Sequence, residues 1–269
     1  MHQPDDLRPR AVRSPVQRRR VLRCAWIALS GAALFAVLLV LVRTGWAPLA
    51  RLDQGWVAAL HRYSLRHPVW TAAMQTLADL GAPWVMRTLL GVVALWLWTL
   101  GARVLAGWLA AQALVAWLVS SAGRQLIGRA RPHFGDPVAI GSGAAFPSGH
   151  AIASAVACGA LLALVWPRAD RPVRAVAGTA AAVTVLGVGW TRIALGVHWP
   201  SDVLAAWLAA AVVLTGVTLA VELWLPGRLG RDARLLRQRI RPRVQRVLAP
   251  PLPPLPSAES AADRDPRRS

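Results

Sequence analysis

Three short clusters of polar residues interrupt an otherwise hydrophobic chain, and their residue types suit chemistry on a phosphate group. In order they read Arg-x6-Arg-Pro, Pro-Ser-Gly-His and Thr-Arg-x5-His-x3-Asp, beginning at residues 124, 147 and 191. Arginine guanidinium groups keep their charge and pair phosphate oxygens through two parallel N–H bonds. Histidine serves as a nucleophile or a general acid near neutral pH. The clusters therefore indicate phosphoryl transfer.

In this order and spacing, the clusters resemble the signature of the type 2 phosphatidic acid phosphatase (PAP2) family. That family includes lipid phosphate phosphatases, bacterial undecaprenyl-pyrophosphate phosphatases and the vanadium haloperoxidases. Two positions depart from its pattern: Arg124 stands where the family has lysine, and Thr191 stands where it usually has serine. All 31 basic residues of the chain are arginine, so an arginine at the lysine position follows the composition. The resemblance is tight over residues 124–202 and extends further only through the hydrophobic layout.

The resemblance implies a phosphate site built from five residues. Arg124, Arg131 and Arg192 would bind the nonbridging oxygens and neutralise charge in the transition state. Ser148 would add a hydroxyl donor, and Gly149 would let the backbone approach closely because it has no Cβ. These two residues come just before a hydrophobic run that is expected to be helical. A helix N-terminus presents free N–H groups to an anion, so a phosphate would dock there.

The resemblance also implies the catalytic roles. His198 would attack phosphorus and form a phosphohistidine, Asp202 would accept the second ring N–H of His198, and His150 would protonate the leaving oxygen. No cofactor and no metal is expected. The arginines already supply positive charge, and they would repel a cation from a zinc site formed by His150, His198 and Asp202. Arg129 and His133 lie beside the first cluster but outside its pattern. Arg129 is expected to be a loop charge or a lipid headgroup contact.

Long uncharged runs must position these clusters. The chain has 269 residues, of which 55% are hydrophobic. An α-helix needs about 20 apolar residues to cross a membrane. The runs that approach this length are 24–42, 88–102, 104–122, 151–166, 175–191 and 203–221. The fold class predicted is an all-α bundle of six transmembrane helices with a PAP2-type four-helix catalytic core, which excludes a soluble haloperoxidase.

The distribution of arginine predicts how the bundle lies in the membrane. Arginines crowd the segment 1–23, the loop 167–174 and the tail from residue 226, and six spans would place all three on one side. Positive loops face the cytoplasm, so the N- and C-termini are predicted to be cytoplasmic. The three clusters then lie at the extracytoplasmic face of the cell inner (plasma) membrane. The domain division is a basic segment 1–23, a membrane domain 24–225 and a basic, Pro-rich tail 226–269.

Two flanking segments carry their own expectations. The outer segment 43–82 is too long for a simple hairpin, and Trp56, Leu60 and Tyr63 recur at helical spacing within it. The sequence therefore predicts either an interfacial helix or a structured loop over residues 53–66. The tail is expected to be disordered and cytoplasmic, with its arginines attracted to anionic headgroups. No nucleic-acid motif accompanies this charge, so membrane lipid is the expected partner.

These observations predict an integral membrane lipid phosphatase that hydrolyses a phosphate monoester or a pyrophosphate. A polyprenyl pyrophosphate is the favoured substrate, with phosphatidic acid and phosphatidylglycerophosphate as alternatives. Two other functional hypotheses stay open. The protein could be a lipid phosphotransferase, or a catalytically silent membrane protein that binds or transports lipid. The sequence assigns no oligomeric state.

Overall fold

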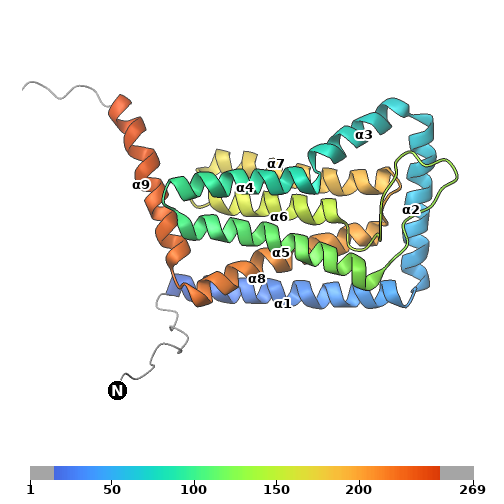
Figure 1. Ribbon diagram of the computed structural model, residues 1–269, viewed down its shortest axis with the longest axis horizontal. Helices are drawn as coiled ribbons and strands as arrows, with labels where there is room; N and C mark the ends of the chain where they lie inside the picture. The colour runs from blue at the N-terminus through green and yellow to red at the C-terminus, as the bar shows by residue number, and fades with distance from the viewer. Residues whose placement is uncertain (1–14, 249–269) are drawn as a thin grey trace, which may run out of the picture.

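Nine α-helices make up the part of the chain that the computed structural model describes, residues 15–248 (Figure 1). Side chains of Val16 and of residues 240–248 are not described. The helices are α1 (Pro15–Arg43), α2 (Ala47–Arg66), α3 (Pro68–Leu80), α4 (Pro83–Thr99), α5 (Arg103–Ile127), α6 (Gly149–Val165), α7 (Arg171–Ala194), α8 (Pro200–Trp224) and α9 (Arg228–Leu248). No strand occurs between residues 15 and 248, so the all-α prediction is confirmed for this region.

Proline and glycine set several of the helix boundaries that matter for the site. Proline occupies the first turn of α2, α3, α4, α7 and α8, where its missing N–H costs nothing and its φ suits a helix. Helix α5 ends at Gly128, whose φ of 64° is left-handed and whose N–H bonds the Arg124 carbonyl at 3.2 Å. The chain then enters the loop 128–148, which carries the rest of the first cluster.

Helices α4 to α8 form the bundle, with α1 along the outside of α8 (Figure 1). Helix α6 packs on α4, α5, α7 and α8, and its buried face is rich in alanine and other small residues. Small side chains let helix backbones approach closely within a membrane. At Gly189 on α7, an added Cβ would lie 2.4 Å from the Trp207 ring of α8, so the glycine makes room for this ring.

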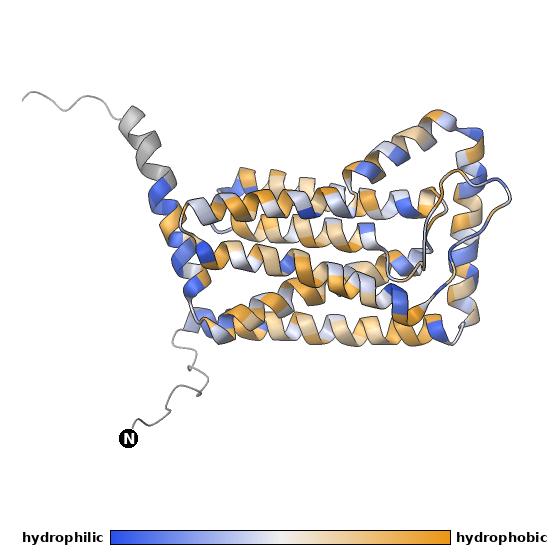
Figure 2. Ribbon diagram, viewed as in Figure 1, coloured by the Kyte–Doolittle hydropathy of each residue, from blue (hydrophilic) through white to orange (hydrophobic). Residues whose placement is uncertain are grey.

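Five stretches are long and apolar enough to cross a membrane: Gln17–Arg43, Pro68–Thr99, Arg103–Ile127, Arg171–Ala194 and Pro200–Trp224. Apolar side chains cover the outside of the bundle (Figure 2). Helix α6 is a shorter apolar helix of 17 residues. At 1.5 Å per residue it is about 25 Å long, against roughly 30 Å for the hydrocarbon core. The helical membrane bundle is therefore confirmed, whereas the count of six full-length spans is not.

The outer segment 43–82 forms two helices, α2 and α3, in place of a loop (Figure 1). Helix α2 lies across the end of the bundle, and its buried residues are Asp53, Val57, His61 and Ser64. Trp56 and Tyr63, which predicted the helix, are half exposed on its other side. The buried face of α2 is therefore partly polar, and it is turned toward the three clusters.

Helix α9 differs from the disordered tail that the composition predicts from residue 226. Leu229 and Leu236 are buried in the same core cluster as Leu97 and Leu105. Asp232 on the same helix accepts the backbone N–H of Val104 at 2.8 Å and that of Leu105 at 3.2 Å. Apolar burial and this helix cap outweigh the repulsion between arginines for residues 228–236. The proline-rich part of the tail, 249–269, lies outside the described residues.

Candidate active site

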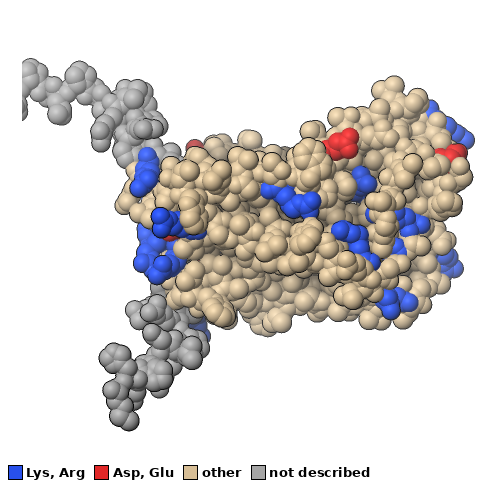
Figure 3. Space-filling model, in the orientation of Figure 1, with Lys and Arg blue, Asp and Glu red and all other residues tan. Residues whose placement is uncertain are grey.

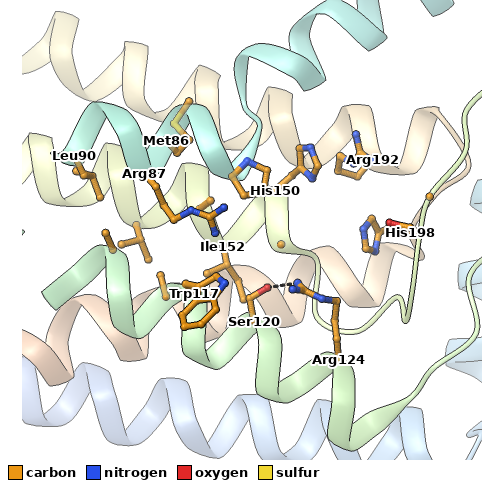
Figure 4. Close-up of a pocket in the computed structure, with 18 of the residues that line it drawn as sticks. Met86, Arg87, Leu90, Trp117, Ser120, Arg124, His150, Ile152, Arg192 and His198 are labelled. Carbon is orange, nitrogen blue, oxygen red and sulfur yellow. Dashed lines mark hydrogen bonds between the residues drawn. The ribbon is translucent and has the colours of Figure 1, made fainter. Parts of the chain in front are cut away.

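A cavity of about 390 Å³ lies among α4, α5, α6 and the loops that join the helices at the α2 end of the bundle (Figure 4). Six of the residues predicted from the three clusters line it: Arg124, Arg131, Gly149, His150, Arg192 and His198. Arg87 of α4, which the sequence clusters do not include, also lines it. The cavity continues between Met86, Leu90 and Trp117, so one end is cationic and the other apolar (Figure 4). No aspartate or glutamate is among its lining residues.

Arg124 enters this cavity from the last turn of α5. Its guanidinium donates to the hydroxyl of Ser120, one turn back on the same helix (Figure 4), and to that of Ser121. The space that it fills lies against Gly149, where an added Cβ would be 3.0 Å from Nη1 of Arg124. The absence of a side chain at Gly149 therefore lets the arginine head reach the start of α6.

Arg131 is held by backbone carbonyls of the loop 128–148 and of the connection between α7 and α8. Its Nε donates to Gly143 O at 2.9 Å, Nη2 to Ser142 O at 2.9 Å, and Nη1 to Val197 O at 2.6 Å. Burial lowers the pKa of Arg131, with the Asp202 charge opposing that shift and the Arg124 charge adding to it. The guanidinium stays charged at any physiological pH. A fixed cation thus stands beside His198.

The Ser148–Gly149–His150 turn begins α6 and is bonded to the third cluster. Ser148 is the residue before the first turn, and its N–H donates to Asp202 O at 3.2 Å. Its hydroxyl is buried and has no hydrogen-bond partner within the described chain. Gly149 and His150 line the cavity, whereas Ser148 does not. The free N–H groups of this helix start lie next to the arginines, as an anion site requires.

His198 lies in the short connection between α7 and α8. Its N–H and that of Val197 both donate to Arg192 O, at 3.1 and 3.2 Å, which closes the end of α7. Nε2 lies 3.0 Å from Nη1 of Arg131, and Nδ1 lies 3.5 Å from Oδ2 of Asp202. Arginine can only donate, so Nε2 is the ring nitrogen with the lone pair and the proton is on Nδ1, facing the carboxylate.

Burial lowers the pKa of His198 from 6.5 to about 4. Asp202 opposes this shift through its bond to the ring and its charge, while the Arg131 and Arg192 charges add to it. The imidazole is therefore neutral at neutral pH. A neutral ring with a free lone pair is the form that can act as a nucleophile.

Asp202 is completely buried in the first turn of α8 and does not line the cavity. Its Oδ2 accepts the Trp199 N–H at 3.0 Å, and its Oδ1 accepts Nη1 of Arg129 at 2.6 Å. Arg129 also bonds Asp53 of α2 at 2.8 Å. The expectation that Arg129 is a loop charge or a headgroup contact is therefore wrong, because its guanidinium forms ion pairs with two buried carboxylates.

Thr191 and His133 both lie outside the cavity. The Thr191 hydroxyl is buried and donates to Val188 O at 2.7 Å within its own helix, a bond that serine would also make. His133 is exposed and lies outside the cavity. Within residues 15–248, no group of three or more His, Cys, Asp or Glu side chains is placed to hold a metal ion.

Comparisons with known proteins agree with this arrangement. The model of the PAP2 superfamily matches residues 101–225. Phosphatidylglycerophosphatase B of Escherichia coli K12 is 34% identical over 88 residues, which are 33% of this chain and 31% of that protein. The same values hold for phosphatidylglycerophosphatase B of Shigella flexneri. The chain thus spans about a third of the length of the curated relatives that it matches.

The fold is also similar to that of a solved protein. It matches the crystal structure of a transmembrane PAP2 type phosphatidylglycerolphosphate phosphatase from Bacillus subtilis with a TM-score of 0.57 and 20% identity. The match covers 72% of this chain and 94% of that one. Residues 101–225, which carry all three clusters, therefore match the PAP2 superfamily, and the chain shares the helical membrane fold of a solved PAP2 type protein.

Proposed function

We propose that this protein is a membrane lipid phosphatase that works through a phosphohistidine on His198. One observation supports this most: a neutral histidine, a second histidine and four guanidinium groups line a single cavity whose other end is apolar. Arginines in such a site stabilise the charge that develops on a transferred phosphoryl group. The apolar end suits the tail of a lipid whose phosphate faces water.

The reaction would take place in two steps. In the first, the Nε2 lone pair of His198 attacks phosphorus and the bond from phosphorus to the bridging oxygen breaks, while His150, protonated to the imidazolium once the anionic substrate is bound, gives its proton to that oxygen. Nε2 must release the Arg131 donor at 3.0 Å, and that donor then bonds a phosphoryl oxygen. In the second step, water attacks phosphorus, the P–N bond breaks, and His150 takes up the proton of the water.

The charge of the cavity favours a lipid that carries two phosphate groups. Arg87 adds a fourth guanidinium to the three of the sequence clusters, and no lining carboxylate offsets them. A polyprenyl pyrophosphate, with two linked phosphates, remains the substrate that we propose first. Phosphatidylglycerophosphate also has two phosphates and is the second candidate, because the relatives are named for it. Phosphatidic acid has only one.

Purified protein in detergent, assayed for phosphate release from these three lipids, tests the proposal. We expect His198→Ala to release no phosphate and to form no acid-labile phosphoprotein. His150→Ala should be slower by about 10²–10⁴-fold, because it lacks the proton donor for the leaving oxygen. The matched control is His133→Ala, an exposed histidine outside the cavity, which should behave as the wild type.

Several outcomes would contradict this proposal. Near-normal turnover by folded His198→Ala would remove the nucleophile assignment. Loss of wild-type activity on adding a chelator would indicate a metal-dependent reaction. Phosphate transfer to an added alcohol in preference to water would indicate a phosphotransferase. Lipid binding without any phosphate release would favour the silent lipid-binding reading. Finally, faster hydrolysis of phosphatidic acid than of both two-phosphate lipids would refute the charge argument.

A further inference from the structure

Behind the cavity wall, one arginine joins two buried carboxylates from distant parts of the chain. Arg129 donates from Nη1 to Asp202 Oδ1 at 2.6 Å and from Nη2 to Asp53 Oδ2 at 2.8 Å. The exposed fractions of the two carboxylate side chains are 0% and 1%, and that of Arg129 is 18%. None of the three lines the cavity. This cluster is therefore separate from the residues that would touch the substrate.

Ser201 completes the cluster and makes it rigid. Its hydroxyl donates to Asp53 Oδ2 at 2.5 Å and accepts Nη1 of Arg129 at 2.7 Å, and its N–H donates to Asp53 Oδ1 at 3.0 Å. Asp53 thereby caps the start of α8, the helix turn that carries Asp202. The Arg129 guanidinium also lies over the Trp199 ring at 5.6 Å. Every oxygen of the two carboxylates has a donor, as buried charged groups require.

We propose that Asp53 and Arg129 are positioning residues for the phosphoryl-transfer reaction, acting on His198 through Asp202. Arg129 and the Trp199 N–H hold the two oxygens of Asp202, which leaves Oδ2 facing Nδ1 of His198 at 3.5 Å. Removing Arg129 would leave two buried carboxylates without a cation. Asp202 would then turn away from the ring or recruit water, and His198 would lose the group that keeps its proton on Nδ1.

This inference rests on the proposed function but assigns a role to a part of the fold that the PAP2 model does not match. Asp53 belongs to α2, which precedes the matched residues 101–225 by more than thirty positions. Helix α2 would thus be more than an interfacial anchor, since it supplies a carboxylate to the support of the nucleophile. Arg129 comes from the loop after α5, so the cluster joins three segments behind His198.

Two substitutions of similar size test the inference. Arg129→Lys keeps the charge but cannot bridge both carboxylates, and Asp53→Asn keeps the shape but removes one charge. We expect kcat to fall by about ten- to a hundredfold in each, with KM changed by no more than about twofold. The double variant should lose no more than the worse single one, because both disrupt the same cluster. The matched control is Arg66→Lys on α2, which should leave kcat unchanged.

The tautomer of His198 supplies a readout that a merely structural role would not change. ¹⁵N-histidine NMR of wild-type protein in detergent should show the ring proton on Nδ1, and both variants should show a mixture with the Nε2 form. A purely structural role predicts a lower melting temperature with wild-type kcat per folded molecule and an unchanged tautomer. That result, in folded Arg129→Lys and Asp53→Asn, would overturn the inference.

The NMR experiment requires no turnover, so it remains decisive if the wild type releases no phosphate and the proposed function fails. Ser201→Ala covers the case in which Arg129→Lys does not fold. This variant keeps all three charges and removes only the hydroxyl that links Arg129 to Asp53. A partial shift of the tautomer with a smaller loss of kcat is expected, and a wild-type tautomer and kcat would count against the positioning role.

Discussion

At the scale of residues, the cavity combines four guanidinium groups with one neutral imidazole. His198, the proposed nucleophile, is buried, and the two neighbouring cations Arg131 and Arg192 add to the burial that keeps it uncharged. Asp202 limits this effect and fixes the proton on the far nitrogen. The same cations that would bind a phosphate therefore also keep the attacking nitrogen unprotonated.

Substitutions of Arg124 test whether the positive charge or the planar geometry of the guanidinium matters more at the position where the family has lysine. Its guanidinium lies in the cavity beside Gly149, whereas Arg129 does not line the cavity. We expect Arg124→Ala to lower kcat/KM by about 10²–10³-fold, as the loss of one preorganised donor does. Arg124→Lys should keep measurable activity, because the charge remains and Ser120 can still orient it. Kinetics on the active lipid check this, and an active Arg124→Ala would show that the first cluster is wrongly aligned.

The pKa of His198 gives a prediction about pH. Its folded value of about 4 lies below the ordinary 6.5. Between these values the unfolded chain binds more protons at this site than the folded chain does, so its contribution to stability falls as pH drops from 6.5 to 4. We expect ¹⁵N-histidine NMR to show a neutral His198 at pH 5. A titration midpoint near 6.5 would mean that the ring is well solvated and that its neighbours do not control it.

At the scale of elements, the cavity depends on how closely α5 approaches the turn before α6. An added Cβ at Gly123 would lie 2.5 Å from Cδ of Pro147, whose ring cannot move without shifting the backbone. Gly123 precedes Arg124, and Pro147 precedes Ser148. The distance between these two backbones therefore constrains how far Arg124 lies from the start of α6.

Gly123→Ala is expected to damage both stability and activity. Overpacking of this kind costs about 1–3 kcal/mol, and the shift should move Arg124 away from the start of α6. Gly107→Ala is the matched control on the same helix, because no atom lies within 4 Å of its added Cβ. Thermal unfolding in detergent and phosphate release measure the two effects. Equal melting temperatures and activities for both variants would show that the close approach does not constrain the site.

At the scale of the whole molecule, the two ends of the bundle differ in what their charges contact. At the α9 end, Arg20 pairs with the buried Glu222 at 2.8 Å, and Asp232 caps α5. At the α2 end, arginines line the cavity or join the cluster behind it. Figure 3 shows basic side chains grouped at the α9 end and again around the cavity half of this face. We propose that the α9 end faces the cytoplasm, in accordance with the positive-inside rule.

Single cysteines can test this orientation in spheroplasts. The background should lack Cys24 and Cys158. Ile140→Cys suits the cavity side because residue 140 is 91% exposed, whereas a side chain at Gly141 would clash with Arg131. Ala169→Cys marks the opposite end, between α6 and α7. An impermeant thiol reagent should label position 140 and not 169. The reverse pattern would place the chemistry in the cytoplasm and change the candidate lipids.

The sequence alone determined the helical membrane bundle and six of the residues that line the cavity. Uncharged runs of membrane length can only be helical in lipid, so the all-α bundle followed from hydropathy. Arg124, Arg131, His150, Arg192 and His198 were identified by type and spacing, since phosphate chemistry restricts which side chains can serve. Such patterns record local periodicity and the groups that would touch a substrate.

Only the tertiary structure decided which residues hold the cavity side chains in place and whether the start of the tail is ordered. Asp53, Arg129 and Ser201 come together because α2 crosses the end of the bundle, and no local pattern specifies a pairing across more than seventy residues. Likewise, α9 is ordered by the burial of Leu229 and Leu236 against the bundle, although its composition resembles a disordered basic tail. Both outcomes depend on the free energy of long-range burial and ion pairing, which arises only once the helices have packed.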